Sequence, residues 1–176
     1  AFKGGATTVR AVRIGGDDGK PGSIELKNAD GSPATAVTIT AAHPGTRSFT
    51  VSVRTNLITD NRQVIIYDGT DIFEQFSFTP GENEPQNLVA AMAQSKNFVA
   101  KAASSVKGPL ASVTQQPLAG GKNPTVKTAS YEKGTDILER YKWNCIIADS
   151  DDSAVQLLLQ NFVVQSYQTG HLGFAS

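Results

Sequence analysis

The sequence predicts an α+β protein in which a small antiparallel β-barrel or β-sandwich domain is inserted into an α/β domain containing a βαβ unit. Short runs rich in β-branched and aromatic residues, separated by turn-forming residues, occupy residues 23–78 and are typical of a small barrel or sandwich. Apolar residues recur at helical spacing in residues 82–94. Residues 143–176 follow the order apolar run, helical pattern, short apolar run, which is the order of a βαβ crossover.

The composition narrows the class of protein. Of the 176 residues, 39% are hydrophobic and 18% are charged, which is typical of a globular chain with a buried core. Lys and Arg total 16, as do Asp and Glu, so the net charge is zero. Because the chain also lacks a Lys/Arg cluster, no nucleic-acid partner is expected. No apolar run approaches the ~20 residues of a membrane span, so no membrane partner is expected either.

The first half of the chain is expected to consist of strands. Apolar residues interrupted by two arginines predict a strand at 7–14, and the turn-forming residues of 15–22 mark a junction. Alternation of apolar and polar side chains in residues 47–55 indicates a half-buried strand. The other strands of the β domain are expected at residues 23–26, 35–42, 62–68 and 71–78.

Helical patterns appear farther along the chain. A helix is expected at 82–94, with Pro85 near its first turn, where proline is tolerated. Gly134 weakens a second helix, expected at 130–143, by about 1 kcal/mol relative to Ala. Residues 103–129 are rich in Ser, Gly, Pro, Thr and Gln and read mainly as loop. Short strands are expected at 97–103 and 110–116.

The C-terminal part has the clearest pattern. An apolar run at 143–149 predicts a strand covered on both faces, and a broad apolar stripe in 150–169 predicts a helix buried against a sheet. Gly170 is expected to cap this helix, and residues 171–176 are expected to return as a strand. Cys145, the single cysteine, lies in the apolar run. It is expected to be a buried small hydrophobic side chain in a protein of a reducing compartment.

These elements predict three segments. Residues 1–20 supply the first strand of the α/β domain, residues 21–85 form the inserted β domain, and residues 86–176 complete the α/β domain. The chain begins with Ala1 rather than Met, and its last expected strand stops at Ser176 just where it would pair. We therefore expect a fragment of a longer protein, truncated at its C-terminal end.

The most suggestive motif is the glycine pair before a lysine at residues 120–122. A phosphate-binding loop of the G-x-x-x-x-G-K-[ST] type has a glycine five residues before the second glycine of this pair and Ser or Thr after the lysine. Gln116 and Asn123 occupy those positions, and Pro124 lacks a backbone N–H near the place where the loop would need one. The motif is therefore interpreted as a flexible backbone turn in which the Lys122 side chain is solvated.

Further groups of residues resemble chemical sites, but a structural role fits each better. Asp149, Asp151 and Asp152 resemble a Mg²⁺ or Ca²⁺ ligand set, yet they lie at an expected helix N-terminus, where Ser150 or Asp151 is predicted to be the cap. Two Ser-x-x-Lys pairs lack the accompanying motifs of acyl-transfer enzymes, and the two histidines have no His or Cys at metal spacing. These residues are Ser104 with Lys107, Ser130 with Lys133, His43 and His171. The sequence thus predicts no enzyme and no catalytic, cofactor or metal site.

Four stretches of the chain occur in an order that carries a resemblance. They are AFKGGATTVRAVRIG at 1–15, HPGTRSFTVSVRT at 43–55, DIFEQFSF at 71–78 with NLVAAMAQSKNFVAKA at 87–102, and the stretch from PLAGGKNPT to the end of the last helix and strand at 117–175. In this order the chain resembles the tail sheath proteins of contractile bacteriophages and related contractile particles. One departure is Lys122-Asn123-Pro124, which stands where the family often has Gly-Gly-x-Asp-Gly.

This resemblance implies a structural role without an active site or cofactor. It implies the central fragment of a sheath subunit, with an outward-facing inserted β domain above an α/β domain. Such subunits polymerise helically around the tail tube, and contraction of the sheath drives the tube through the host envelope. The implied partners are other sheath subunits and, for the full-length protein, tube and baseplate proteins of the virion tail. The fragment alone is expected to be monomeric.

Two alternatives stay open at the level of sequence. A non-enzymatic binding module, such as a carbohydrate- or receptor-binding β domain on an α/β base, would be favoured by an exposed aromatic platform. The aromatic residues of the β domain instead fall mostly at positions expected in its core, and they are Phe49, Tyr67, Phe73, Phe76 and Phe78. An enzyme would use the Ser-x-x-Lys pairs or the aspartate cluster.

Overall fold

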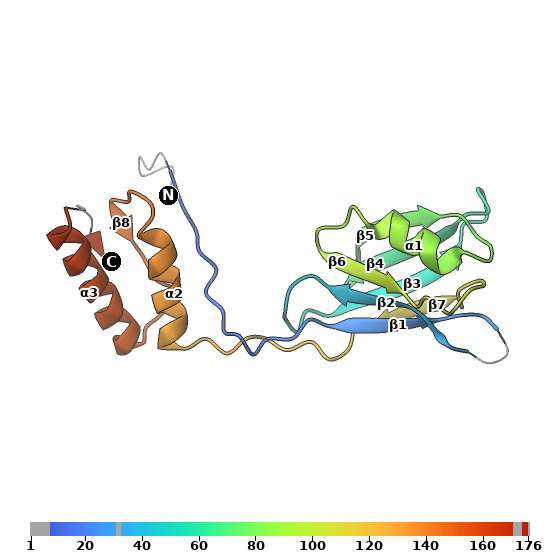
Figure 1. Ribbon diagram of the computed structural model, residues 1–176, viewed down its shortest axis with the longest axis horizontal. Coiled ribbons are helices and arrows are strands. Elements are labelled where there is room, and N and C mark those ends of the chain that lie inside the picture. The colour runs from blue at the N-terminus through green and yellow to red at the C-terminus, as the bar shows by residue number, and fades with distance from the viewer. Residues whose placement is uncertain (1–7, 31–32, 171–173, 176) are drawn as a thin grey trace. The chain divides into compact units, whose positions relative to one another are not determined.

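The structure of the protein, a computed structural model, describes residues 8–30, 33–170 and 174–175. The chain forms two compact units (Figure 1). Residues 18–124 form one of them, called here the β unit, and residues 1–17 with 125–176 form the other, called the helical unit. The predicted α+β class is confirmed, because the described residues contain three helices and two antiparallel sheets.

The β unit contains both antiparallel sheets. The strand order is β1-β2-β6 in the three-stranded sheet and β5-β4-β3-β7 in the four-stranded sheet. Its seven strands are β1 (Ser23–Lys27), β2 (Thr35–Ala41), β3 (Phe49–Thr55), β4 (Arg62–Asp68), β5 (Asp71–Phe78), β6 (Phe98–Ala102) and β7 (Val113–Pro117). Each strand predicted between residues 23 and 116 is therefore confirmed, with small shifts of its ends.

The core of the β unit is built from the inward faces of its strands and from helix α1 (Glu84–Met92). The alternation in β3 places Val51 and Val53 in the core, because side chains along a strand point alternately to the two faces. Leu88 and Met92 of α1 are also buried, and α1 packs against β5 and β6. The rest of the buried apolar cluster is Ile24, Leu26, Ala36, Val37, Ile39, Phe49, Val64, Ile66, Phe78, Phe98 and Leu110.

The sheets do not close into a barrel within the described residues. Isolated bridges join β1 to residues that flank β7, but β5 and β6 are edge strands of two different sheets. The β unit also extends beyond the inserted domain predicted at 21–85, because α1, β6 and β7 complete its sheets and core. The domain boundaries at 1–20, 21–85 and 86–176 themselves stay a prediction.

The first described segment of the helical unit, residues 8–14, belongs to no sheet in the described part of the chain. Residues 8–14, which are most of a predicted strand, have no strand partner in the described part of the chain. They pack instead near helix α2 (Thr128–Leu138), where the Arg10 guanidinium lies 4.2 Å from the centre of the Tyr141 ring. A Cβ atom on Gly134 would lie 2.5 Å from Ile14 Cδ1, the end of a flexible side chain that would have to shift, so residues 8–14 lie close against this turn of the helix.

The predicted βαβ unit is present at the C-terminal end. Strands β8 (Cys145–Ile146) and β9 (Phe174–Ala175) are parallel, and helix α3 (Ser153–Gln168) lies between them in the chain. Strand β8 is shorter than predicted. Residues 171–173 and 176, part of the predicted returning strand, lie outside the described residues.

Burial in the helical unit differs from the prediction. Cys145 is exposed rather than buried, because side chains alternate along β8 and Ile146 takes the buried position. In α3, Val155 and Leu159 are buried, whereas Leu157 of the predicted apolar stripe is exposed. The expectation that both faces of β8 and the whole stripe of α3 are covered is therefore wrong for the described residues.

Candidate functional site

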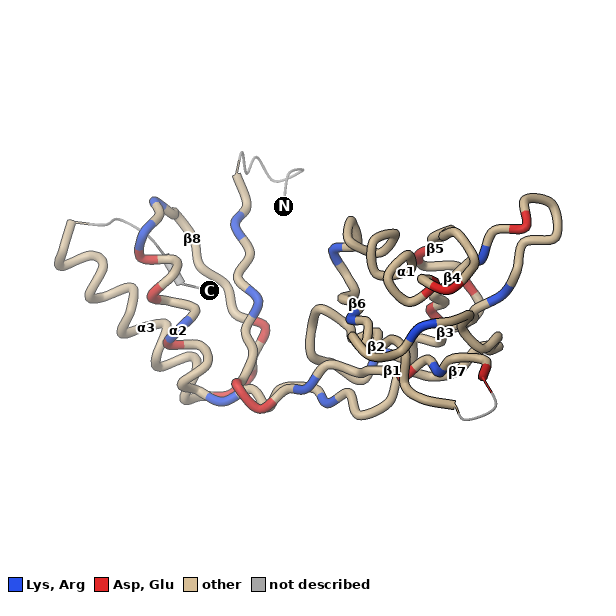
Figure 2. The backbone as a smooth tube through the Cα atoms, turned by 45° about the vertical axis from the view of Figure 1, so that its right-hand side comes forward, with Lys and Arg blue, Asp and Glu red and all other residues tan. Residues whose placement is uncertain are grey.

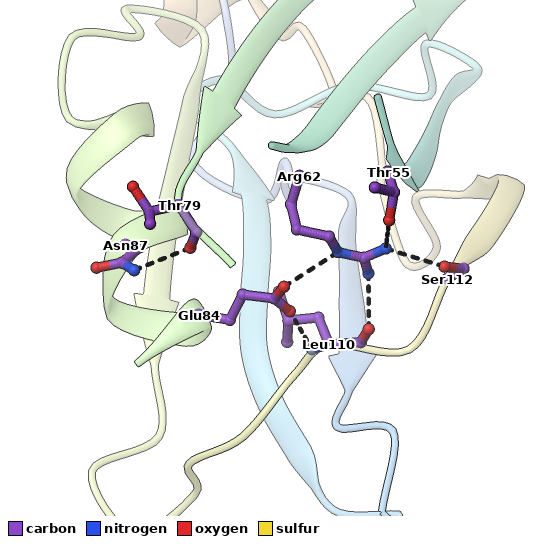
Figure 3. A network of polar contacts seen from close by, with 7 residues as sticks. All are labelled: Thr55, Arg62, Thr79, Glu84, Asn87, Leu110 and Ser112. Carbon is purple, nitrogen blue, oxygen red and sulfur yellow. Dashed lines mark hydrogen bonds and ion pairs between the residues drawn. The ribbon is translucent and has the colours of Figure 1, made fainter. Parts of the chain in front are cut away.

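A buried polar network surrounds Glu84 at the start of α1 (Figure 3). Glu84 and Arg62 are only 1% and 7% exposed. Glu84 Oε1 lies 3.1 Å from Arg62 Nε, and Glu84 Oε2 accepts a hydrogen bond from the Leu110 N–H. The Arg62 guanidinium donates to the Leu110 carbonyl oxygen at 2.7 Å. It also donates to the hydroxyl groups of Thr55 and Ser112, each at 3.1 Å.

This network, called here the Arg62–Glu84 lock, holds parts of the fold together and is not a reactive site. It joins β4, the first turn of α1 and the segment before β7, three parts that are distant in the sequence. Burying a carboxylate and a guanidinium is costly unless they pair and satisfy their remaining hydrogen bonds. Here the two groups pair and both terminal nitrogens of Arg62 donate to protein oxygens, whereas Arg62 Nε has the ion-pair contact but no hydrogen bond. Because so little of either side chain is exposed, the pair has almost no surface to offer a substrate.

The Gly-Gly-Lys motif lies in a backbone ladder and not in a phosphate cradle. Lys20 and Lys122 exchange N–H···O bonds of 3.0 and 2.8 Å, and Gly120 has a φ of 78°, a conformation that favours glycine. The predicted backbone role is confirmed. The flexible turn needs correction, since the segment is hydrogen-bonded. Lys122 is exposed as predicted, and its Nζ lies 2.7 Å from the Asp18 carboxylate.

The aspartate cluster caps helix α3. Asp152 Oδ1 accepts a hydrogen bond of 2.9 Å from the Ala154 N–H, so the cluster does cap the helix, but the capping residue is Asp152 and not the predicted Ser150 or Asp151. Asp149 instead accepts a hydrogen bond of 3.2 Å from the Tyr131 hydroxyl. Within the described part of the chain, no group of three or more His, Cys, Asp or Glu side chains is arranged to hold a metal ion.

Neither Ser-x-x-Lys pair is assembled as a nucleophile with its base. Ser104 and Lys107 are exposed in a segment that is not helical. Ser130 lies in α2, where its hydroxyl accepts a hydrogen bond of 3.3 Å from the backbone N–H at the helix N-cap. Lys133 Nζ lies 2.8 Å from an Asp17 carboxylate oxygen. The serine and lysine side chains of this pair are therefore engaged with different partners.

His43 contributes no recognisable site within the described residues. His43 is exposed in a bend between β2 and β3. His171 lies outside the described residues.

Three aromatic side chains of the β unit pack on one another instead of forming a platform. The Phe49 and Phe98 rings are 5.0 Å apart in an edge-on arrangement, and the Phe73 ring lies 5.2 and 6.1 Å from them. The Arg47 guanidinium covers Phe49 and Phe73 at 5.0 and 5.2 Å. Phe73 is 36% exposed, but the Arg47 guanidinium lies over its ring, so the cluster does not present the bare flat ring that would favour a sugar-binding module.

An open depression of about 400 Å³ lies between β5 and the loop from α1 to β6, lined by residues 74–76 and 94–97. The Glu74 carboxylate at its wall already accepts hydrogen bonds from Ser95 at 2.7 Å and Asn97 at 2.6 Å. Lys and Arg are interspersed with Asp and Glu along both units (Figure 2). None of the described helices is both long enough and apolar enough to cross a membrane.

Sequence reasoning missed the Arg62–Glu84 network. Its one local signal is an acidic residue beside Pro85 in the first turn of a helix, which reads equally well as a charge opposing the helix dipole. The burial of Glu84 depends on the packing of α1 against the strands, and that packing involves residues far away in the chain.

The fold is similar to that of known proteins, although no protein-family model and no curated protein matches the sequence. The sheath tail protein from Desulfitobacterium hafniense matches with a TM-score of 0.70 at 16% identity, over 93% of this chain and 35% of that protein. The sheath tail protein from Listeria innocua matches with a TM-score of 0.59 at 19% identity, over 85% of this chain and 32% of that protein. The chain thus spans about a third of the length of each protein. The resemblance predicted from the sequence is confirmed at the level of the fold.

Proposed function

We propose that the chain is the central part of a contractile tail sheath subunit, with a structural role and no catalytic activity. The fold match to the Desulfitobacterium hafniense protein, which extends over 93% of this chain, carries the proposal. The order of the four sequence stretches supports it independently. In this role many copies wrap the tail tube as a helix and contract to drive the tube through a host envelope. The partners are other sheath subunits, the tube and the baseplate, and the location is the virion tail.

The β unit fits a part that keeps its shape while contacts between subunits change. Its closely packed core and the Arg62–Glu84 lock make a unit that resists internal deformation. Switching between two sheath lengths would then rearrange contacts between subunits and leave the interior of this unit unchanged.

Exposed apolar side chains in both units fit a protein that assembles. Leu57 and Ile58, at the tip of the β3–β4 hairpin, are 92% and 93% exposed. Asn56 Oδ1 accepts a hydrogen bond of 2.9 Å from the Ile58 N–H, which holds the tip in place. Grouped apolar side chains on a surface mark contact sites. We propose that these side chains, together with Leu157 and Tyr167 of α3, contact neighbouring subunits.

The test compares this 176-residue chain with the full-length product of its gene. Electron microscopy of the full-length protein is expected to show helical tubes, because the polymer contacts are then complete. Sedimentation of the 176-residue chain is expected to show monomers. A full-length protein that is folded and stays monomeric at high concentration would contradict the proposal.

A further inference from the structure

The Gly-Gly-Lys motif lies where both chain connections leave the β unit, at residues 17–18 and 124–125. The two connections run antiparallel and are joined backbone to backbone. Lys20 and Lys122 exchange hydrogen bonds of 3.0 and 2.8 Å, and Ser23 and Ala119 exchange two bonds of 2.8 Å. The segments before β1 and after β7 thus form a short two-stranded ladder.

A third segment, the bend at residues 43–46, closes on this ladder. The Gly45 N–H donates to the Lys20 carbonyl oxygen at 3.2 Å. The Thr46 N–H donates to Asn123 Oδ1 at 3.1 Å. Two main-chain N–H groups of the bend therefore bind both connections at once.

Glycine allows these backbones to approach. A Cβ atom on Gly121 would collide with the carbonyl oxygen of Gly45. A Cβ atom on Gly19 would lie 2.8 Å from Pro44 Cβ and 3.0 Å from Pro124 Cβ. The contact of Gly121 and the 2.8 Å contact of Gly19 are closer than real Cβ atoms come, so a side chain at either glycine would force the segments to shift.

An ion pair lies on the outside of the ladder, between Lys122 Nζ and the Asp18 carboxylate. Its two side chains are roughly half exposed, and exposed pairs contribute little to stability. The close glycine contact and the backbone hydrogen bonds, rather than charge, therefore hold the segments together.

We propose that residues 18–22, 43–46 and 119–124 form a clasp that binds the two connections of the β unit into one ribbon. The two connections between the β unit and the rest of the chain then move together and not independently. A displacement of either connection is passed to the other through the ladder. This inference concerns the chain by itself and does not depend on the sheath proposal.

The test measures the freedom of the two units in the full 176-residue chain with spin labels. Cys145 is exposed and is the only cysteine, so it takes one label in the helical unit. Lys101→Cys, on an exposed position of β6, takes the second label in the β unit. Pulsed electron resonance gives the distribution of distances between the labels. Hydrogen exchange of the Lys122 amide reports whether the clasp is closed.

Gly121→Val is the test variant, and Gly120→Asn is its neighbouring control. Gly120 has a φ of 78° and no atom within 4 Å of an added Cβ, and asparagine tolerates this conformation. We expect Gly121→Val to remove the protection of the Lys122 amide and to broaden the distance distribution, while Gly120→Asn changes neither. Exchange at the β4 amides shows whether the β unit is still folded. If valine unfolds it, the smaller Gly121→Ala replaces valine in the same comparison.

Two results would overturn the clasp. Protection of the Lys122 amide that survives the substitution would show that the close contact does not hold the ladder. Lost protection with an unchanged distance distribution would show that the ladder does not couple the connections. Neither result bears on whether the full-length protein forms tubes, so the clasp and the sheath function can each be overturned without the other.

Discussion

The two units of the chain differ in how completely they bury their apolar side chains. The β unit encloses a contiguous cluster between two sheets and α1, and several of its members have no exposed surface. In the helical unit, Ile146, Val155 and Leu159 are buried, but Ile147 is 76% and Leu157 is 58% exposed. One unit has a core of its own, and the described part of the other has apolar surface left uncovered.

This difference indicates a division of roles. Stability comes mainly from apolar area removed from water, so we expect the β unit to have the larger free energy of unfolding. A unit with uncovered apolar surface gains stability when another surface packs on it. The β unit therefore fits a rigid body, and the helical unit fits a region whose order increases on assembly.

The largest expected effect is a difference in hydrogen exchange between the units of the monomeric chain. Amides of β3 and β4 should exchange only through opening of the whole β unit, whereas amides of α3 should exchange through local opening. We expect the free energies of opening to differ by several kcal/mol, on the order of the stability of a small domain. Mass-spectrometric exchange on the 176-residue chain measures this. Equal protection in the two units would contradict the inference that the β unit is the more stable of the two.

The next largest effect concerns the buried ion pair of the β unit. Glu84→Gln leaves the buried Arg62 charge without its carboxylate partner, so we expect a loss of about 3–5 kcal/mol in the free energy of unfolding of this unit. Urea unfolding followed at the β unit, by exchange or fluorescence, measures the loss. Protection of α3 should be unchanged if the units unfold separately.

An exposed ion pair in the same unit supplies the control. Asp68→Asn removes the partner of Arg47 at a site where the two side chains are 34% and 58% exposed. Because solvent screens such a pair, we expect a change of at most about 1 kcal/mol. Equal effects of the two substitutions would show that Glu84 is not in a desolvated network.

The strands of the β unit were predictable because their signal is local. Alternation in residues 47–55 identifies the buried face of β3 directly, and its partners follow the same pattern. Residues 8–14 have a strand-like composition, but a strand also requires a partner, and composition contains no information about one. The predicted burial of Cys145 is wrong for a related reason, since an apolar run does not show whether one or both faces of the strand are covered.

The candidate sites were predictable to a similar extent. The absence of a phosphate loop at residues 120–122 follows from spacing alone. A cap by this cluster follows from acidic residues before an apolar helix, but the pattern points to Ser150 or Asp151 and the structure uses Asp152. The Arg62–Glu84 pair and the contact between Gly121 and Gly45 join residues that are distant in the sequence, so neither could be read from a local pattern.

A smaller effect is expected at the start of α3 in the helical unit. Asp152→Ala removes the hydrogen bond to the Ala154 N–H, so we expect a loss of about 1 kcal/mol in the local stability of the helix. Exchange of the first-turn amides of α3 measures it. Asp151→Ala is the matched control, because the Asp152 carboxylate makes the cap bond, and its effect should be clearly smaller. Any change at β4 would contradict independent unfolding of the two units.

The smallest expected effect on folding is at the tip of the β3–β4 hairpin. Leu57→Ser and Ile58→Ser remove apolar side chains that are almost fully exposed, so the stability of the monomer should change by no more than about 0.5 kcal/mol. The tip keeps its shape because Asn56 holds it through the backbone N–H groups of residues 58 and 59. If the tip contacts a neighbouring subunit, the same substitutions should reduce the yield of tubes from the full-length protein, as counted by electron microscopy. Unchanged yield with unchanged stability would remove the hairpin tip from the proposed interface and leave the α3 surface as the remaining candidate.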